Sequence, residues 1–261
     1  MFLVDVLRPR VVVELGTYYG TSLCSFCQAV KELGTNTRCY GIDTWRGDPQ
    51  GGFFGSEILE DLRAHHDPLY GEFSRLIQST FSEARNHFQP GSIDLLHIDG
   101  YHTYEAVKQD FEEWLPKMSA SGVVLLHDIN VRERDFGVWK FWDELDGRYP
   151  RFEFLHGYGL GLLATGQEHP DLIRYLCNCD AEDATAIRRF FYQIGSRLEQ
   201  AQEIQTLRNF NDNQSSAIGT LQSQVQCIQS LWLIRLLRKT PRQLFGTVLK
   251  RAARSLGLSH I

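Results

Sequence analysis

The sequence lacks an apolar run long enough to cross a membrane. A bilayer-spanning helix needs about 20 apolar residues, and the most apolar stretch, around 231–237, is short and interrupted by Arg235. A recognisable signal peptide is missing as well. We therefore expect no membrane span and a cytoplasmic location.

The cysteine pattern of a zinc site or a disulfide framework is also missing. Cys24 and Cys27 form one C-x-x-C pair, but the second pair of a structural zinc site is absent. The six cysteines are scattered through 261 residues, a chain long enough to fold without disulfides. The pattern predicts free thiols in a reducing compartment.

Basic residues are not dominant, except at the C-terminal end. The net charge of -5 argues against a nucleic-acid partner. Residues 231–261 nevertheless combine apolar residues with a run of basic ones: Arg235, Arg238, Lys239, Arg242, Lys250, Arg251 and Arg254. This basic amphipathic tail is predicted either to make peripheral contact with the inner membrane face or to dock on the acidic body.

Short β-rich runs alternate with helical segments through the first two thirds of the chain. Strands are predicted at 11–15, 39–43, 75–79, 93–99 and 122–128, and helices at 21–33, 53–65 and 104–118. Two closing runs, 152–156 and 159–166, are separated by a short Gly-rich turn and predict an antiparallel hairpin at one sheet edge. The fold class is α/β, with a Rossmann-like, seven-stranded, mostly parallel sheet.

Helical periodicity continues after the sheet. The pattern divides the chain into a main domain at 1–170, a helical extension at 171–230 and the tail at 231–261. Apolar residues spaced three and four apart within 218–232 indicate a short coiled coil, interrupted upstream by the polar segment 210–216. The extension either self-associates, binds a partner such as a glycosyltransferase, or packs on the body.

The first strand is followed by a turn that lacks the first glycine of a dinucleotide fingerprint. Glu14 stands in place of that glycine and would repel a pyrophosphate, whereas Gly16 and Gly20 keep the turn tight. Asp43 ends the second strand, where a carboxylate can accept hydrogen bonds from ribose hydroxyls. A cationic ligand that carries a ribose fits this pattern better than a dinucleotide does.

The E-x-G-x-x-x-G motif at 14–20, together with Asp43, resembles the class I S-adenosylmethionine-dependent methyltransferases. This resemblance implies that S-adenosylmethionine is the cofactor. It implies cofactor contacts from the first turn, the end of the second strand, the segment after the third strand and the end of the fourth strand: Glu14, Gly16, Thr17, Gly20, Asp43, Ser79, Phe81 and Asp99.

A second constellation follows the fourth and fifth strands. Asp99, His127 and Asp128 are predicted to meet at one edge of the sheet as ligands of Mg²⁺ or Mn²⁺. His102, three residues beyond Asp99, is predicted to be the general base. A metal would lower the pKa of an acceptor hydroxyl while the imidazole takes its proton.

The segment 97–128 is similar to metal-dependent macrolide-sugar O-methyltransferases, a subgroup found with polysaccharide and antibiotic glycosylation genes. In that resemblance Asp99 and Asp128 match metal ligands and His102 matches the base. His127 departs from it, because an acid is expected at that position. The resemblance implies methylation of a sugar hydroxyl on a glycan or glycosylated metabolite, with a small-molecule or lipid-linked acceptor.

Two other functions compete with this interpretation. One is a non-catalytic assembly protein that recruits glycosyltransferases. The other is a nicotinamide-dependent oxidoreductase, which the missing glycine disfavours. Three local expectations also follow. The glycine-rich segment 46–55, with His65 and His66, is expected to form a lid. Four aromatic residues are expected either to line a sugar pocket or to lie in the core: Tyr101, Tyr104, Trp139 and Trp142. Asp110 is expected on a solvated helix face.

Overall fold

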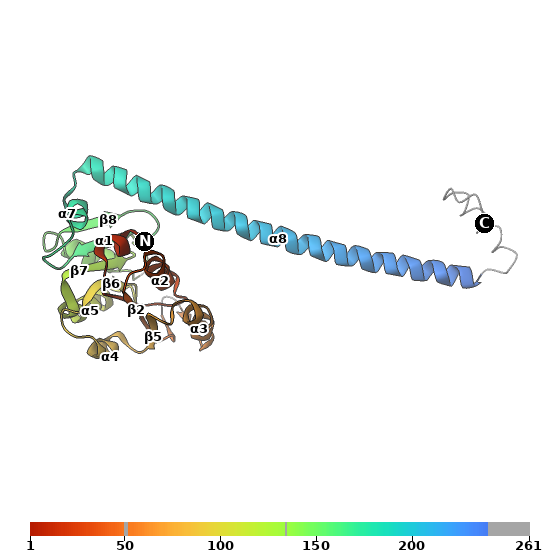
Figure 1. Cartoon of the computed structure of the whole chain (residues 1–261), viewed down its shortest axis with the longest axis horizontal. Coiled ribbons are helices and arrows are strands. Elements are labelled where there is room, and N and C mark those ends of the chain that lie inside the picture. The colour runs from red at the N-terminus through yellow and green to blue at the C-terminus, as the bar shows by residue number, and fades with distance from the viewer. Residues whose placement is uncertain (50–51, 134, 240–261) are drawn as a thin grey trace. The chain divides into compact units, whose positions relative to one another are not determined.

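The computed structural model describes residues 1–49, 52–133 and 135–239 (Figure 1). The chain divides into two compact units, Met1–Tyr192 and a second unit that begins at Gln193. The first unit contains the sheet and the helices around it. The second unit consists, in its described part, of the continuation of the last helix.

A seven-stranded sheet is the centre of the first unit, with the strand order β5-β2-β1-β6-β7-β9-β8. The five strands from β5 to β7 pair in parallel, and β9 and β8 are antiparallel to the strands beside them. The strands span Val11–Leu15 (β1), Arg38–Asp43 (β2), Ser74–Gln78 (β5), Ile93–Ile98 (β6), Met118–His127 (β7), Arg151–Phe154 (β8) and Leu160–Ala164 (β9).

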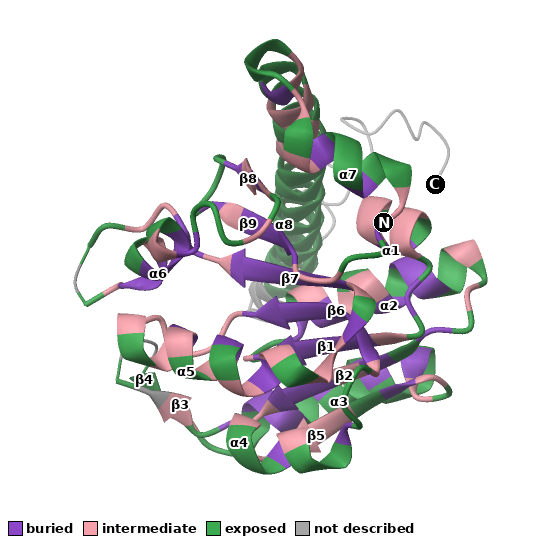
Figure 2. Cartoon of the chain, turned by 90° about the vertical axis from the view of Figure 1, so that its left-hand side faces the viewer, coloured by how far each residue is buried: buried purple, intermediate pink, exposed green. Residues whose placement is uncertain are grey.

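Both faces of the central strands are buried, as Figure 2 shows by their purple colour. Alternate residues of one strand enter different cores: Val12 packs with the cluster that includes Leu23 and Ile173, and Val13 packs with the cluster that includes Phe111 and Trp114. This two-sided burial explains why the strands are continuous apolar runs in the sequence. It places the polar ends of the strands, rather than their middles, at the surface.

Helices cover the two faces of the sheet. One face packs against α4 (Phe81–Ala84), α5 (Tyr104–Trp114) and α6 (Val138–Glu144). The other packs against α1 (Phe2–Leu7), α2 (Thr21–Leu33), α7 (Asp171–Asn178) and the start of α8 (Ala181–Lys239). The helix α3 (Glu57–Tyr70) follows a small hairpin of β3 (Gly47–Asp48) and β4 (Gly52–Phe53).

The predicted fold class, all seven strands and the edge hairpin are confirmed. Two helices have different bounds. The helix expected at 53–65 is α3 at Glu57–Tyr70, because β4 occupies the start of that segment. The helix expected at 104–118 ends at Trp114, where Pro116 lies in a 3-10 turn (Leu115–Lys117) before β7 begins.

The C-terminal helices differ from the expected boundaries. The first unit extends past residue 170, because Ile173, Leu176 and Ala184 are buried against the sheet. The polar segment 210–216 does not interrupt α8, since it contains neither proline nor glycine. Among the described residues, no helix has the length and apolarity needed to cross a bilayer. Of the predicted basic tail, 240–261 lie outside the described residues.

Candidate active site

A cavity of about 710 Å³ lies at the carboxyl ends of the parallel strands. This is the edge at which open α/β sheets bind ligands, and the volume suits a small molecule. Segments that follow β1, β2, β5 and β6 contribute its walls. The lining includes Gly16, Thr17, Tyr18, Asp43, Phe54, Thr80, Phe81, Asp99, Gly100, Tyr101, His102 and Phe136.

The turn after β1 reaches the end of β6 at Gly16. This residue has φ +88°, and a Cβ there would lie 2.0 Å from the carbonyl oxygen of Asp99. The amide of Asp99 donates to the Leu15 carbonyl at 2.8 Å, which holds the two segments together. Glycine at this position therefore lets the β1 turn and the Asp99 segment form one continuous cavity wall.

Asp43, at the end of β2, is held by the neighbouring backbone. Its Oδ2 accepts a hydrogen bond from the Tyr18 amide at 2.9 Å, and its Oδ1 accepts one from the Trp45 amide at 2.8 Å. A carboxylate oxygen has a second lone pair, so both oxygens keep acceptor capacity. Asp43 is thus a fixed acceptor on the cavity wall, as the prediction of a ribose contact requires.

Aromatic and small polar residues complete the cavity. Phe81, which was predicted to contact the cofactor, lines it at the start of α4, and its ring lies against Gly100. Thr80 lines the cavity, whereas Ser79 does not. Gly47 and Phe54, from the predicted lid segment, also border the cavity. The side chains of Tyr18 and Phe136 were not predicted to line the cavity, because no short motif marks them.

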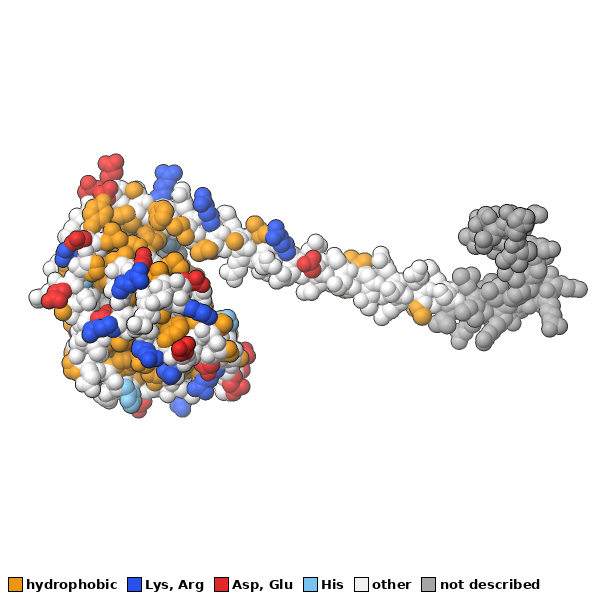
Figure 3. Space-filling view, in the orientation of Figure 1, with side chains coloured by type: hydrophobic (Ala, Val, Ile, Leu, Met, Phe, Trp, Pro, Cys, Tyr) orange, Lys and Arg blue, Asp and Glu red, His pale blue; other side chains and the backbone are white. Residues whose placement is uncertain are grey.

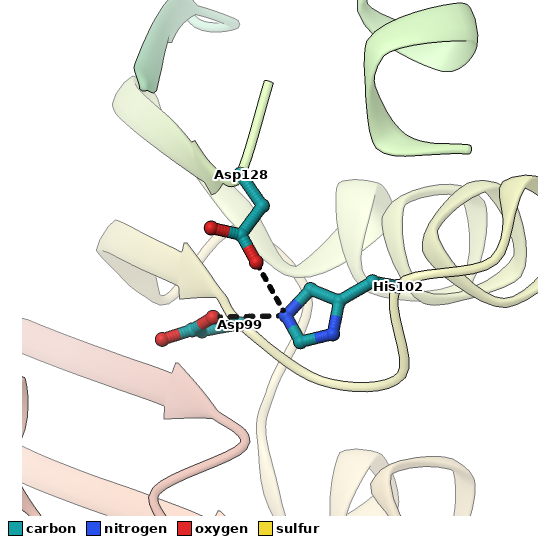
Figure 4. Close-up of side chains that lie close together, drawn as sticks. All are labelled: Asp99, His102 and Asp128. Carbon is teal, nitrogen blue, oxygen red and sulfur yellow. Dashed lines mark hydrogen bonds and ion pairs between the residues drawn. The ribbon is translucent and has the colours of Figure 1, made fainter. Parts of the chain in front are cut away.

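Asp99, His102 and Asp128 come together where β6 and β7 end (Figure 4). Asp99 and His102 line the cavity, whereas Asp128 does not. His102 Nε2 lies 3.3 Å from Asp99 Oδ1 and 3.1 Å from Asp128 Oδ2. Asp128 has φ +62°, a left-handed conformation that aspartate tolerates and that turns its carboxylate toward His102. The His102 ring also stacks on Phe136, with centroids 4.8 Å apart.

His127, the third predicted metal ligand, contacts the same carboxylates. Its Nδ1 lies 2.8 Å from Asp128 Oδ1 and 3.2 Å from Asp99 Oδ1. These are ion-pair distances without hydrogen-bond geometry, since both His127 Nδ1 and Asp128 Oδ1 are buried atoms that form no hydrogen bond within the described residues. Four ligand-type side chains therefore face one another across a few ångströms.

In this cluster, contacts between carboxylates and imidazoles favour the charged form of each group. Burial opposes ionisation of Asp99, but contacts with His102 and His127 hold its pKa well below its ordinary range. Burial also opposes the His127 cation, yet the contacts with Asp128 and Asp99 raise its pKa to about 10.

Besides Ser79, two predicted cofactor residues do not line the cavity. Glu14 is completely buried, and its Oε1 accepts a hydrogen bond from His97 Nδ1 at 2.9 Å when that nitrogen carries the proton. Gly20 caps α2 with φ +77° and packs against Leu62, whose side chain would lie 2.4 Å from an added Cβ. Both residues support the first turn, and neither reaches the cavity surface.

Three local expectations change with the structure. His66 does not belong to a lid, because it is buried and its Nε2 bonds to Ser74 Oγ at 2.8 Å. Of the four aromatic residues considered for a sugar pocket, Tyr101 lines the cavity and Trp142 is buried in the core. Asp110 is not fully solvated: burial, with help from the charge of Glu113, raises its pKa to about 7.

One protein family matches just under half of the chain. Residues 13–129 match a family described as a methyltransferase domain. This segment runs from β1 to the turn after β7, so it contains the first cavity turn, Asp43, Asp99, His102 and Asp128. This segment therefore resembles a methyltransferase domain, which agrees with the predicted class of enzyme.

One curated protein is similar to a large part of the chain. The uncharacterized protein y4gI of Sinorhizobium fredii is 50% identical over 168 residues, which cover 64% of this chain and 18% of that protein. The chain thus spans about a fifth of that relative's length.

Two solved structures resemble the chain more distantly. The O-methyltransferase TomG of Streptomyces achromogenes, involved in tomaymycin synthesis and solved with SAM, is 18% identical over 63% of this chain and 77% of that chain, with a TM-score of 0.47. The SAH-bound methyltransferase PaMTH1 of Podospora anserina is 15% identical over 60% and 71% of the two chains, with a TM-score of 0.46.

Proposed function

We propose that the protein transfers the methyl group of S-adenosylmethionine to a hydroxyl oxygen. One observation carries this proposal: a fixed ribose acceptor, Asp43, and a histidine between two carboxylates, His102, line the same cavity. The matched methyltransferase family supports the reaction class. Cofactor and acceptor would then meet within one enclosed space, as in-line transfer requires.

The first turn and the segments beside it suit the cofactor. Asp43 would accept hydrogen bonds from the ribose hydroxyls, and Phe81 would pack against the adenine ring. Gly16 leaves room for the methionine part along the backbone of the β1 turn, and Thr17 lines the same wall. Among the described residues that line the cavity there is no lysine or arginine to bind a pyrophosphate, which favours a sulfonium ligand over a dinucleotide.

His102 would serve as the general base. The carboxylates of Asp99 and Asp128 hold its imidazole in place and stabilise the imidazolium that forms when it takes a proton. The acceptor oxygen, once deprotonated, attacks the methyl carbon from the side opposite the sulfur, the carbon–sulfur bond breaks, and S-adenosylhomocysteine leaves. Methylation of an oxygen needs such a base more than methylation of an amine does.

A divalent cation fits the same cluster. Asp99, Asp128 and His127 would hold Mg²⁺ or Mn²⁺, and the buried Asp128 Oδ1 and His127 Nδ1, which form no hydrogen bonds within the described chain, are suitable ligand atoms. His127 would have to lose its proton on binding, so metal affinity would rise with pH. When bound, the cation would lower the pKa of the acceptor hydroxyl.

A sugar hydroxyl is the acceptor we infer. The aromatic rings of Tyr101 and Phe136 border the cavity beside His102, and such rings pack well against the apolar faces of sugars. The resemblance of the segment 97–128 to sugar O-methyltransferases points the same way. The acceptor would be a glycan, a glycosylated metabolite or a lipid-linked sugar.

Calorimetric titration tests the cofactor first. The protein is titrated with S-adenosylmethionine and, separately, with NADH, each with and without Mn²⁺. We expect binding of the methyl donor only. Binding of NADH alone would support the oxidoreductase instead, and binding of neither by folded protein would support an assembly role.

Methyl transfer then tests the acceptor and the base. Purified protein is incubated with labelled S-adenosylmethionine and a panel of sugars, nucleotide sugars and lipid-linked sugars. We expect His102→Gln to lose transfer at least 100-fold while it keeps cofactor and Mn²⁺ affinity. His87→Ala, a change at an exposed histidine outside the cavity, is the matched control. Loss of Mn²⁺ affinity in His102→Gln would show that His102 is a metal ligand rather than the base.

A further inference from the structure

The second unit carries a regular pattern of exposed apolar residues on α8. Seven large apolar side chains between 204 and 228 are each at least half exposed: Ile204, Leu207, Phe210, Ile218, Leu221, Val225 and Ile228. Phe210 lies outside the regular spacing of the other six. Most other side chains in this part of the helix are polar and uncharged, and Figure 3 shows the apolar ones as isolated orange patches along it. Isolated long helices of this kind gain little stability by themselves.

The spacing of these residues is that of a heptad repeat. Counted from Ile204 as the first position, the first and fourth positions of each heptad are Ile204, Leu207, Asn211, Gln214, Ile218, Leu221, Val225 and Ile228. Six of these eight positions are apolar, and the apolar residues before and after the polar pair Asn211 and Gln214 keep the same register, which is the pattern that lets two helices supercoil around each other. The polar segment 210–216 therefore lies inside the repeat and does not break it.

The residue types at these positions favour a parallel pair. The apolar first positions are all β-branched, namely Ile204, Ile218 and Val225, and leucine occupies the fourth position at Leu207 and Leu221. β-Branched residues at the first position with leucine at the fourth favour two parallel strands over higher oligomers. Asn211 at a first position adds to this preference, because two asparagines can pair only when identical positions face each other.

The flanking charges are complementary in the same arrangement. Glu203 precedes the first heptad position and Arg208 follows the next fourth position. In a parallel, in-register pair, the last position of one heptad faces the fifth position of the next heptad on the other helix. Glu203 of each copy would therefore face Arg208 of the other, which forms two symmetric ion pairs.

We propose that residues 204–228 bind a second copy of this chain as a parallel, in-register, two-stranded coiled coil. Asn211 and Gln214 form its polar layers and fix the register. The six regularly spaced apolar residues become buried in the pair. The association joins two copies of the methyltransferase domain through α8 and does not depend on the reaction proposed above.

Light scattering of the full-length chain tests the association. We expect twice the monomer mass for the natural protein and the monomer mass for Val225→Asp, which places a charge in the apolar seam. Ser223→Asp, two residues away at a position that faces outward in the pair, is the matched control and should stay dimeric. Near-ultraviolet circular dichroism should show the same folded first unit in all three proteins.

Two further experiments separate this arrangement from others. Glu203→Lys and Arg208→Glu should each weaken the dimer at low salt, and the double variant should restore it. Leu221→Cys, in a Cys227→Ser background, should form a disulfide-linked dimer on oxidation, whereas Ser223→Cys in the same background should not. A monomeric natural protein, a failure of the double variant to recover, or an absence of Leu221→Cys cross-linking would overturn the proposal.

Discussion

Substitution of Gly16 by alanine tests whether the close contact between the β1 turn and the Asp99 segment maintains the site. An added Cβ would lie 2.0 Å from the Asp99 carbonyl oxygen and 2.8 Å from the Gly100 amide nitrogen, and all the nearby atoms are backbone. Neither can rotate away, so the two segments have to separate by roughly 1.5 Å to reach an ordinary contact distance. The hydrogen bond from the Asp99 amide to Leu15 would lengthen with them.

The expected cost has two parts. The left-handed backbone at φ +88° costs an alanine about 1–2 kcal/mol, and relief of the backbone clash adds about 1–3 kcal/mol. Gly91→Ala separates these parts, because Gly91 also has a positive φ, +69°, but nothing lies within 4 Å of its added Cβ. The control should therefore show the backbone cost alone.

Urea denaturation and calorimetric titration with S-adenosylmethionine provide the measurements. Gly16→Ala should lose more of the free energy of unfolding than Gly91→Ala by at least about 1 kcal/mol, and only Gly16→Ala should lose cofactor affinity. Equal stabilities in the two variants, with cofactor affinity unchanged in Gly16→Ala, would refute the inference that this contact shapes the cavity.

Three other predictions concern single side chains. Asp43→Ala should weaken S-adenosylmethionine binding by about 10- to 100-fold because the ribose loses its acceptor. The control Asp67→Ala, on α3, should leave this affinity unchanged, and calorimetric titration measures both affinities. Asp128→Asn should lose Mn²⁺ affinity and methyl transfer while keeping the fold, whereas equal Mn²⁺ affinity would remove Asp128 from the proposed metal site. Because burial raises the pKa of Asp110 to about 7, the folded state resists its ionisation while the unfolded state ionises near pH 4. This destabilisation grows from about pH 4 to 7. Asp110→Asn should therefore raise the free energy of unfolding, measured by urea denaturation, more at pH 8 than at pH 5, by roughly 1–2 kcal/mol for this half-buried group. Equal increases at both pH values would contradict the buried environment.

The sequence predicted the sheet because its signals are local. Each central strand is buried on both faces, so it appears as a continuous apolar run, and the hairpin at the edge is marked by a short glycine-rich turn. The helix bounds were less accurate. Residues 53–65 have helical composition, yet the pairing of Gly52–Phe53 with Gly47–Asp48 delays the helix to Glu57.

The site residues also fall into two groups, those that the sequence predicts and those that it does not. Asp43, Asp99 and His102 directly follow parallel strands or lie within a few residues of their ends, so sequence order alone brings them to one edge of the sheet. The residues that complete the cavity from loops, such as Phe136, carry no comparable signal.

The amino-acid sequence by itself determined the positions of the strands along the chain and the heptad spacing of α8, since both follow from a short-range period. It also determined the edge of the sheet at which polar residues gather, since these residues follow the carboxyl ends of parallel strands. Tertiary structure alone decided the direction of each side chain. It turned Glu14 inward to His97, brought Gly20 against Leu62, and used the left-handed backbone of Asp128 to direct its carboxylate at His102. Such choices depend on contacts between segments distant in the chain, and no local pattern records them.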